Sequence, residues 1–458
     1  MSRSGYVCAG GETLLSILDK FFRHKDFRNH FTNDDVANFF SNTCNKILHS
    51  FGQSFAGRRN YDKYIDKEVE MLSKLKGFKF SKPLELLIDS GGFQASVGIL
   101  DRRELDILEK LYYKFVEEDN HVYDRAFILD IPPGPGCKLF DSFDDIYARN
   151  LESYLTAAKL PDQARNKIIY IHHFRTPKLW DIYTKIMVEN DLFDKFQYHA
   201  TGGIVANSSS DTSIPCIIYI LPLIPLLNQA IKAKRDKLFF HVLGGATFRD
   251  ILFYELFTIH VKNIHNIDLE ITYDSSGLFK GLMVGRYVPL LDDFTVKKMD
   301  LRENVLPLRY KDDTTILDKF RQLMNDMADK HHFKNIPLNE VYDKETGTFW
   351  EENRVYSLMY MLDVYSQVQD WLRGEAAIIY KDYIEGNVEE FNTKAEWITR
   401  NINHGKITKK QKAKTTSISR SLDMLTTLDE DMCLYVVNKC LAKDEFVDLM
   451  PERKEFFI

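Results

Sequence analysis

The most regular feature of the chain is a series of short runs of β-branched and aromatic residues, nearly every one of which ends in a polar or glycine-rich cluster. Runs of this length and composition are typical of buried strands. They occupy residues 84–89, 125–131, 167–174, 196–203, 237–245 and 269–274. The clusters at their ends read DSGGFQ, DIPPGP, HHFRT, TGG, LGG and DSSG. The pattern predicts strands that present polar side chains at their carboxyl ends.

Amphipathic helical patterns lie between most of these runs, for example over residues 103–118 and 248–261. Strand and helix in alternation predict a parallel sheet. Polar clusters at the ends of several different parallel strands are typical of a (β/α)8 barrel, which forms its active site there. An open dinucleotide-binding sheet would carry a fingerprint such as GxGxxG or GxxxxGK[ST], and the sequence contains neither. We therefore expect an α/β fold of the (β/α)8 TIM-like class.

The pattern changes near Val305, where the alternation of strand and helix stops. Long helices are expected at Thr314–His331, Asn353–Ile384 and Ile418–Leu441. We therefore divide the chain into a barrel, residues 1–304, and a mainly helical region, residues 305–458, which contains a basic loop and is the expected nucleic-acid-binding region.

That loop is the segment Lys394–Arg420, between the last two expected helices. It carries eight Lys or Arg residues against one acid, Glu396, which gives a local charge of +7. Its lysines include Lys406, Lys409, Lys410, Lys412 and Lys414. A smaller basic patch lies near the start of the barrel and contains Arg58, Arg59 and Lys63. Both patches could contact phosphates, and a solvated surface explains them equally well.

Composition narrows the classes of protein that remain. The 61 basic and 67 acidic residues give a net charge of −6, so the chain is not a bulk polycation of the kind that coats DNA. Its six cysteines form no CxxC pair, which favours reduced thiols and a cytoplasmic location. The N-terminus lacks the pattern of a signal peptide. The most apolar stretch, Ile214–Leu227, is shorter than a membrane helix needs and contains prolines, so we expect it in a core.

Three acids stand at strand ends. Asp89 precedes Ser90-Gly91-Gly92-Phe93, where two glycines would let the backbone approach a flat ligand on which Phe93 could stack. The alternative is a tight turn in which Asp89 caps the next helix. Asp130 precedes a proline-rich loop that would hold its carboxylate in place, unless it forms only an Asx turn.

The third acid, Asp274, ends the run LEITYD and is followed by Ser275-Ser276-Gly277. Acids at the ends of several strands favour chemistry at a glycosidic carbon, because one carboxylate can attack while another transfers protons.

These motifs resemble the tRNA-guanine transglycosylase superfamily, and more closely its archaeal and phage or bacterial DNA 7-deazaguanine branches. DSGGFQ is the family's most recognisable string, and DIPPGPG, TGGIV, HVLGG and YDSSGLFKG follow in the family's order, with His172 where the family has a base-contacting glutamine. The resemblance covers about residues 84–282.

The resemblance implies a glycosyltransferase, specifically a pentosyltransferase, in which Asp274 is the nucleophile at C1′ and Asp89 is the general acid and base. It implies that Asp130 binds the N1 and N2 edge of guanine. The base pocket that it implies consists of Ser90, Gly91, Gly92, Phe93, Asp130, His172, Gly202, Gly203, Leu243 and Gly244. A free 7-deazaguanine base such as preQ0 would be a substrate, and no cofactor is expected.

The chain departs from the family's tRNA enzymes in one motif. Their CxCxxC and histidine zinc site has no counterpart after Asp274, where only Cys433 and Cys440 remain. Those two cysteines have a spacing typical of one helix face, so we expect core residues rather than zinc ligands, although His331 and His332 could join them. The family's tRNA enzymes engage RNA partly through the zinc subdomain, so its absence favours double-stranded DNA as the partner.

Three functions remain open from the sequence. The first is a DNA guanine transglycosylase that inserts a 7-deazaguanine and so protects phage DNA from restriction in the host cytoplasm. The second is the same chemistry on tRNA, and the third is a non-catalytic nucleic-acid binder on the same fold. No membrane partner is expected, and a homodimer, which relatives often form, stays open.

Overall fold

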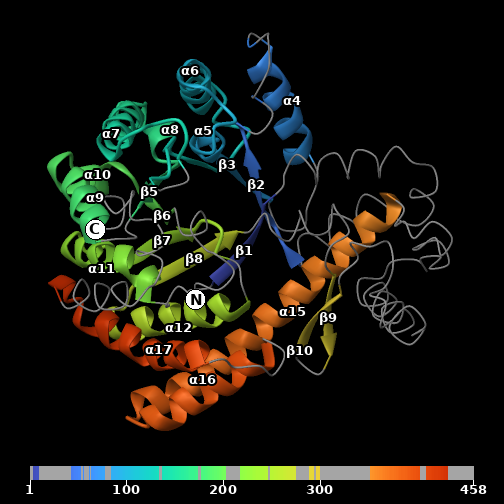
Figure 1. Cartoon of the computed structure of the whole chain (residues 1–458), viewed down its shortest axis with the longest axis vertical. Coiled ribbons are helices and arrows are strands. Elements are labelled where there is room, and N and C mark those ends of the chain that lie inside the picture. Colours follow the sequence, from blue (N-terminus) through green and yellow to red (C-terminus); the bar gives the residue numbers. More distant parts are fainter. Residues whose placement is uncertain are drawn as a thin grey trace.

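The computed structural model contains a closed barrel of eight parallel strands in the order β1 to β8, in which β8 pairs back with β1 (Figure 1). It describes residues 4–9, 43–52, 55, 61, 63–77, 84–133, 137–173, 177–202, 217–245, 248–274, 288–292, 295–299, 351–402 and 409–431. The strands are β1 (Ser4–Ala9), β2 (Lys46–Ser50), β3 (Glu85–Asp89), β4 (Arg125–Phe127), β5 (Ile168–His172), β6 (Tyr198–Thr201), β7 (Lys237–Val242) and β8 (Asp268–Asp274). The predicted (β/α)8 class is confirmed.

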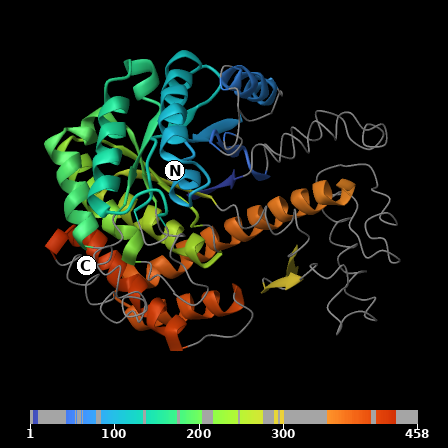
Figure 2. The same cartoon turned by 45° about the horizontal axis from the view of Figure 1, so that its top comes forward.

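Helices surround the barrel on its outer side (Figures 1 and 2). The described helices up to β8 are α4 (Tyr64–Lys76), α5 (Gly92–Ser96), α6 (Arg102–Glu118), α7 (Phe143–Ala158), α8 (Asp162–Arg165), α9 (Pro177–Glu189), α10 (Leu192–Lys195), α11 (Ile217–Lys232) and α12 (Phe248–His265). A two-stranded antiparallel sheet, β9 (Val288–Asp292) and β10 (Thr295–Met299), follows β8. The last elements that the structure describes are the helices α15 (Glu351–Ile384), α16 (Val388–Ile402) and α17 (Lys409–Thr427).

Local sequence accounts for several of these helices. A capping box formed by Asp101 and Glu104 begins α6, whose inward face buries Leu105 and Leu108. The apolar stretch that starts at Ile214 forms much of α11, and its described side chains from Leu223 to Leu227 are buried. Among the helices that the structure describes, none is both long and apolar enough to cross a membrane.

The sequence pattern missed the first two strands, β1 and β2. Strand β1 reads SGYVCA and β2 reads KILHS, so each offers only a short apolar run. Their central residues are nevertheless buried, with Val7 and Cys8 fully inside. Small residues and a buried histidine, His49, replace the aliphatic runs that identified the other strands.

The C-terminal helices pack directly on the barrel. On α15, the Tyr365 ring lies 4.9 Å from that of Tyr6 in β1, and Arg373 forms an ion pair of 3.4 Å with Glu255 of α12. On α17, the Thr426 hydroxyl lies 2.9 Å from Nε2 of His260 in α12. Figure 2 shows these three helices along one side of the barrel. The boundary expected between residues 304 and 305 lies outside the described residues.

The described residues of the basic segment Lys394–Arg420 are helical and do not form the loop that the sequence suggested. Residues 394–402 belong to α16, and residues 409–420 belong to α17, which ends at Thr427. The end expected near Leu441 lies outside the described residues. Lysine is a good helix former, so a basic run extends a helix as readily as it forms a solvated loop. The expected helix Thr314–His331 lies outside the described residues.

Strand register brings particular residues together at the carboxyl end of the barrel. Ser50 at the end of β2 is the partner of Asp89 at the end of β3. His241 of β7 is the partner of Thr272 of β8, two residues before Asp274. Parallel strands all end on the same side, so these polar side chains meet at one opening.

Candidate active site

The three acids expected from the sequence lie together at the carboxyl end of the barrel. Asp89 is the last residue of β3, Asp274 is the last residue of β8, and Asp130 follows β4. They are close enough to interact electrostatically, because the negative charges of Asp130 and Asp274 both raise the pKa of the Asp89 carboxyl group. The described parts of the chain therefore contain one acidic site that draws on three different strands.

Asp89 is a carboxyl group with a raised pKa. Burial raises its pKa from an ordinary value near 3.8 to about 6, and the charges of Asp130 and Asp274 push it in the same direction. Hydrogen bonds from Ser50 and from the Gly91 backbone act against this rise. The Ser50 hydroxyl donates to Oδ2 of Asp89 over 2.8 Å. A carboxyl group with a pKa near 6 can both donate and accept a proton near neutral pH.

The segment after Asp89 turns the chain sharply. Gly91 has a positive φ of 94°, and a Cβ there would lie 2.5 Å from the Cα of Gly52. Asp89 does not cap the following helix, since α5 begins after Gly91 without a side-chain cap. Gln94 of α5 instead donates through Nε2 to the Ser50 hydroxyl over 3.2 Å, so Gln94, Ser50 and Asp89 form a hydrogen-bonded chain.

Asp274 is held by two donors on the same oxygen. Its Oδ1 accepts the backbone N–H of Gly244 over 2.9 Å and lies 3.2 Å from Nε2 of His241. The other ring nitrogen of His241 lies 2.8 Å from the Thr272 hydroxyl. Among the residues that the structure describes, no donor is found on the second carboxylate oxygen, Oδ2. With 7% of its surface exposed, Asp274 presents that oxygen in a nearly closed setting.

Asp130 is buried and paired with a histidine. Its Oδ2 lies 2.6 Å from Nε2 of His173, and both side chains are almost inaccessible. The loop after it is clamped by Asn150 of α7, which accepts the N–H of Ile131 over 2.7 Å and donates to its carbonyl over 2.9 Å. Asn150 therefore fixes the backbone that directly follows Asp130.

His172, which the resemblance places in the base pocket, lies beside His199 rather than beside the acids, with its Nε2 3.2 Å from Nδ1 of His199. Its ring lies 5.3 Å from that of His199, which stacks on Phe193 of α10, and 4.7 Å from that of Tyr170. Burial lowers the pKa of His172 well below its ordinary value, and that of His199 to about 3. Side chains alternate along a strand, so His172 faces the surrounding helices and His173 reaches Asp130.

The other expected pocket residues occupy varied positions. Phe93 is 48% exposed at the start of α5. Ser90 is fully buried, and its hydroxyl donates to the carbonyl of Ile128 over 3.4 Å rather than toward Asp89. Leu243 and Gly244 are partly exposed after β7, and Gly202 packs on the ring of His173. Gly203 lies outside the described residues.

Most of the expected nucleic-acid contacts fall outside the described side chains. Arg58, Arg59 and Lys406 lie outside the described residues. Lys63 is exposed just before α4. For Lys409, Lys410, Lys412 and Lys414 the structure describes the helical backbone of α17 and not the side chains. The role of these residues stays a prediction.

Four residues that build the site were missed in the sequence. They are Ser50, Asn150, His173 and His241. His173 and His241 lie inside the strand-end motifs HHFRT and HVLGG, and the alternation of side chains along each strand is the signal that could have identified them. Ser50 carries no local signal because it contacts Asp89 only through strand pairing.

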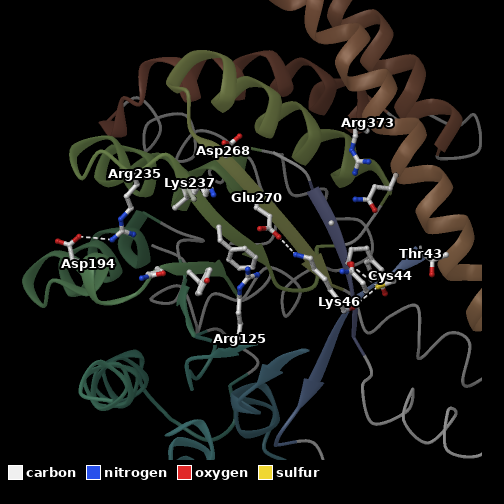
Figure 3. A pocket seen from close by; sticks show the side chains of 18 residues that line it. Thr43, Cys44, Lys46, Arg125, Asp194, Arg235, Lys237, Asp268, Glu270 and Arg373 are labelled. Carbon is white, nitrogen blue, oxygen red and sulfur yellow. Dashed lines mark hydrogen bonds and ion pairs between the residues drawn. The ribbon is translucent and has the colours of Figure 1, made fainter. Parts of the chain in front are cut away.

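The barrel also has a cavity of about 890 Å³ at its opposite, amino-terminal end (Figure 3). Its wall includes Lys46, Arg125 and Glu270 at strand starts. These charges are engaged with one another or with neighbours: Lys46 pairs with Glu270 and Glu85, and Arg125 pairs with Glu85 over 2.5 Å. The described charges around this cavity therefore stabilise the barrel end and define no particular ligand.

No protein-family model matches the chain, and no curated protein matches it. Among the described residues, no group of three or more His, Cys, Asp or Glu side chains could hold a metal ion. Cys433, Cys440, His331 and His332 lie outside that part of the chain. Fold and geometry thus define the class: a (β/α)8 barrel with an acidic site at the carboxyl ends of its strands.

Proposed function

We propose that the chain is a DNA guanine transglycosylase, which exchanges guanine in DNA for a 7-deazaguanine base through a covalent aspartyl-sugar intermediate. The observation that carries the proposal is the contrast between two neighbouring carboxyl groups. Asp274 is fixed by two donors on one oxygen, whereas Asp89 has its pKa raised to about 6. A nucleophile and a proton carrier are the two groups that base exchange with retention requires.

The reaction would proceed in two displacements. In the first, Oδ2 of Asp274 attacks C1′ of the deoxyguanosine and the C1′–N9 bond breaks, while protonated Asp89 supplies a proton to the departing base. In the second, ionised Asp89 removes the N9 proton of the incoming base. That nitrogen attacks C1′, and the bond to Asp274 breaks with its electrons returning to the carboxylate.

The surroundings of the acids suit a flat heterocycle. Asp130 offers a buried carboxylate for the N–H edge of guanine, where two neighbouring donors can share one carboxylate. Gly92 brings the backbone close to this carboxylate, since it packs against the Asp130 backbone. The exposed ring of Phe93 would stack on one face of the base, and Leu243 and Gly244 would cover the other.

The choice of DNA as substrate rests on the sequence. The motif order resembles the DNA 7-deazaguanine branch of the transglycosylase superfamily, and the zinc motif of the tRNA enzymes has no counterpart. A guanine in duplex DNA must leave the stack to reach a barrel mouth, at a cost of a few kcal/mol. Basic residues such as those of α17 would offset this cost by binding the backbone.

The test is incorporation of radiolabelled guanine into double-stranded DNA, single-stranded DNA and tRNA offered in parallel. We expect label in DNA and none in tRNA. Asp274→Asn should abolish incorporation. Asp268→Asn is the matched control, because Asp268 starts the same strand at the other end of the barrel and pairs with Lys262 over 3.2 Å.

Each other outcome of this test replaces the proposal with a defined alternative. Label in tRNA alone would identify a tRNA-guanine transglycosylase. Binding of nucleic acid without incorporation of either guanine or preQ0 would identify a non-catalytic binder. Full activity of Asp274→Asn would reject Asp274 as the nucleophile.

A further inference from the structure

We propose that His241 is a positioning residue for the nucleophile: it fixes Oδ1 of Asp274, so that Oδ2 faces the sugar and charge returning to the carboxylate is stabilised. This inference rests on the proposed transglycosylase function. It is carried by the hydrogen-bonded sequence from Thr272 through His241 to Asp274, with distances of 2.8 Å and 3.2 Å.

The position of the His241 ring is over-determined. The side chain is fully buried on β7, and the Phe127 ring packs against it in an edge-to-face arrangement with centroids 4.9 Å apart. Thr272 is also fully buried and lies opposite His241 in the strand register. A ring held on one nitrogen by a rigid strand neighbour can aim its other nitrogen with little freedom.

The direction of the second hydrogen bond follows from the chemistry of the partner. An ionised carboxylate only accepts hydrogen bonds, so Nε2 of His241 carries the proton that faces Asp274. The backbone N–H of Gly244 reaches the same oxygen over 2.9 Å. Two preset N–H donors on Oδ1 leave the lone pairs of Oδ2 for the attack on C1′.

The two donors act differently in the two displacements. In the covalent intermediate Oδ2 is bonded to C1′, and Oδ1 is the carbonyl oxygen of an ester, a weaker acceptor than a carboxylate. When the incoming base displaces Asp274, the bond electrons return to the carboxylate and the hydrogen bonds to Oδ1 strengthen. Donors aimed at a site of developing charge stabilise the transition state. Loss of His241 should therefore slow breakdown of the intermediate more than its formation.

The experiment separates these two steps on the full-length chain. Enzyme and guanine-containing DNA are mixed without free base, and the covalent adduct is quantified on denaturing gels. The purified adduct is then chased with labelled guanine. For His241→Phe, which keeps a ring and loses the donor, we expect adduct breakdown to fall about 100-fold, the scale of one preset donor. Adduct formation should fall less.

Further variants separate positioning from packing. His241→Gln retains an N–H donor and should recover part of the breakdown rate, and Thr272→Val should cause a smaller loss than His241→Phe. His260→Gln is the matched control. His260 is likewise a buried histidine with both ring nitrogens engaged, at 3.1 Å from the Tyr380 hydroxyl and 2.9 Å from the Thr426 hydroxyl. It should leave the ratio of breakdown to formation unchanged.

The outcomes distinguish this inference from the function on which it rests. A wild-type chain that neither exchanges base nor forms an adduct would overturn both. A wild-type adduct whose breakdown is unaffected by His241→Phe would overturn the positioning role alone. Equal defects in His241→Phe and His241→Gln would likewise overturn it, because they would show that the donor is irrelevant. If His241→Phe does not fold, the test uses the rate of adduct breakdown in Thr272→Val instead. A breakdown rate in Thr272→Val equal to that of the wild type would reject the positioning role of His241.

Discussion

A Cβ atom built at Gly92 would lie 1.6 Å from the carbonyl oxygen of Asp130. The turn after β3 and the loop after β4 therefore touch backbone to backbone at the point where two acids of the site meet. No side chain fits between them. The closeness of Asp130 to Asp89 depends on this contact as much as on the two strands.

Replacing Gly92 by alanine tests the contact. Gly92→Ala must push the Asp130 loop away, and we expect a loss of about 1–3 kcal/mol in the free energy of unfolding together with loss of base exchange. Gly374→Ala is the control, because Gly374 is exposed within α15 and a Cβ there meets nothing within 4 Å. That variant should gain about 0.5–1 kcal/mol. Urea unfolding measures the stability of both variants, and guanine incorporation measures their activity. An active Gly92→Ala would contradict the packing argument.

The raised pKa of Asp89 predicts opposite pH dependences for the two chemical steps. Adduct formation needs the protonated carboxyl group, so its rate should fall as pH rises above about 6. Adduct breakdown needs the ionised form and should rise to a plateau above about 6. Single-turnover rates across the range from weakly acidic to weakly basic pH measure both. Asp89→Asn should be nearly inactive and should lose both dependences, and a flat wild-type profile would reject Asp89 as the proton carrier.

The same pKa has a consequence for stability. A carboxyl group whose pKa rises from near 3.8 to about 6 on folding binds its proton more tightly in the folded state. Its favourable contribution to the free energy of unfolding is therefore present below pH 3.8 and is lost as pH rises through 6, where ionisation of the buried group becomes a penalty. Asp89→Asn removes this penalty and should stabilise the protein at neutral pH. We expect a gain of about 1–2 kcal/mol, allowing for the partial exposure of the group. Unfolding midpoints of the two proteins should converge as the pH falls toward 3.8; a constant difference would contradict the assignment.

The ion pairs at the amino-terminal end of the barrel should affect stability without affecting chemistry. Glu85 lies 3.0 Å from Lys46 and 2.5 Å from Arg125, and the Arg125 guanidinium also lies over the ring of Phe239 at 4.0 Å. Glu85→Gln leaves two partly buried cations undercompensated and should cost about 1–3 kcal/mol. Adduct formation per folded molecule should be unchanged.

The control for this change is an exposed pair on α4. Glu70 and Lys74 are four residues apart and lie 2.7 Å from each other, both largely in solvent. Glu70→Gln should leave the unfolding midpoint unchanged within error. Equal effects of Glu70→Gln and Glu85→Gln would show that the barrel-end network contributes no more than a surface pair.

The lysines of α17 should contribute to binding rather than to catalysis. Replacing Lys409, Lys410, Lys412 and Lys414 by glutamine should weaken binding to all DNA sequences alike. The slope of log affinity against log salt should shrink by about 0.9 for each phosphate that the variant no longer neutralises. A control variant with glutamine at the exposed Lys110 and Lys114 of α6 should keep the full slope. An unchanged slope in the α17 variant would show that this segment is only solvated.

The sequence predicted some strands of the barrel and missed others. The runs from 84–89 to 269–274 became β3 to β8, because buried strands need continuous apolar segments and such segments can be recognised locally. The strands β1 and β2 are too short and too mixed for that signal. Their burial comes from neighbours far away in the chain, such as Tyr365 of α15 against Tyr6.

The sequence by itself determined the class of fold and the acids at the strand ends, since alternation of apolar segments and their polar ends is a local property. Only the tertiary structure decided which side chains meet. Pairing sets the phase of each strand, and a shift of one residue moves a side chain to the other face of the sheet. That is why His173, and not His172, reaches Asp130, and why Ser50 and His241 became partners of Asp89 and Asp274.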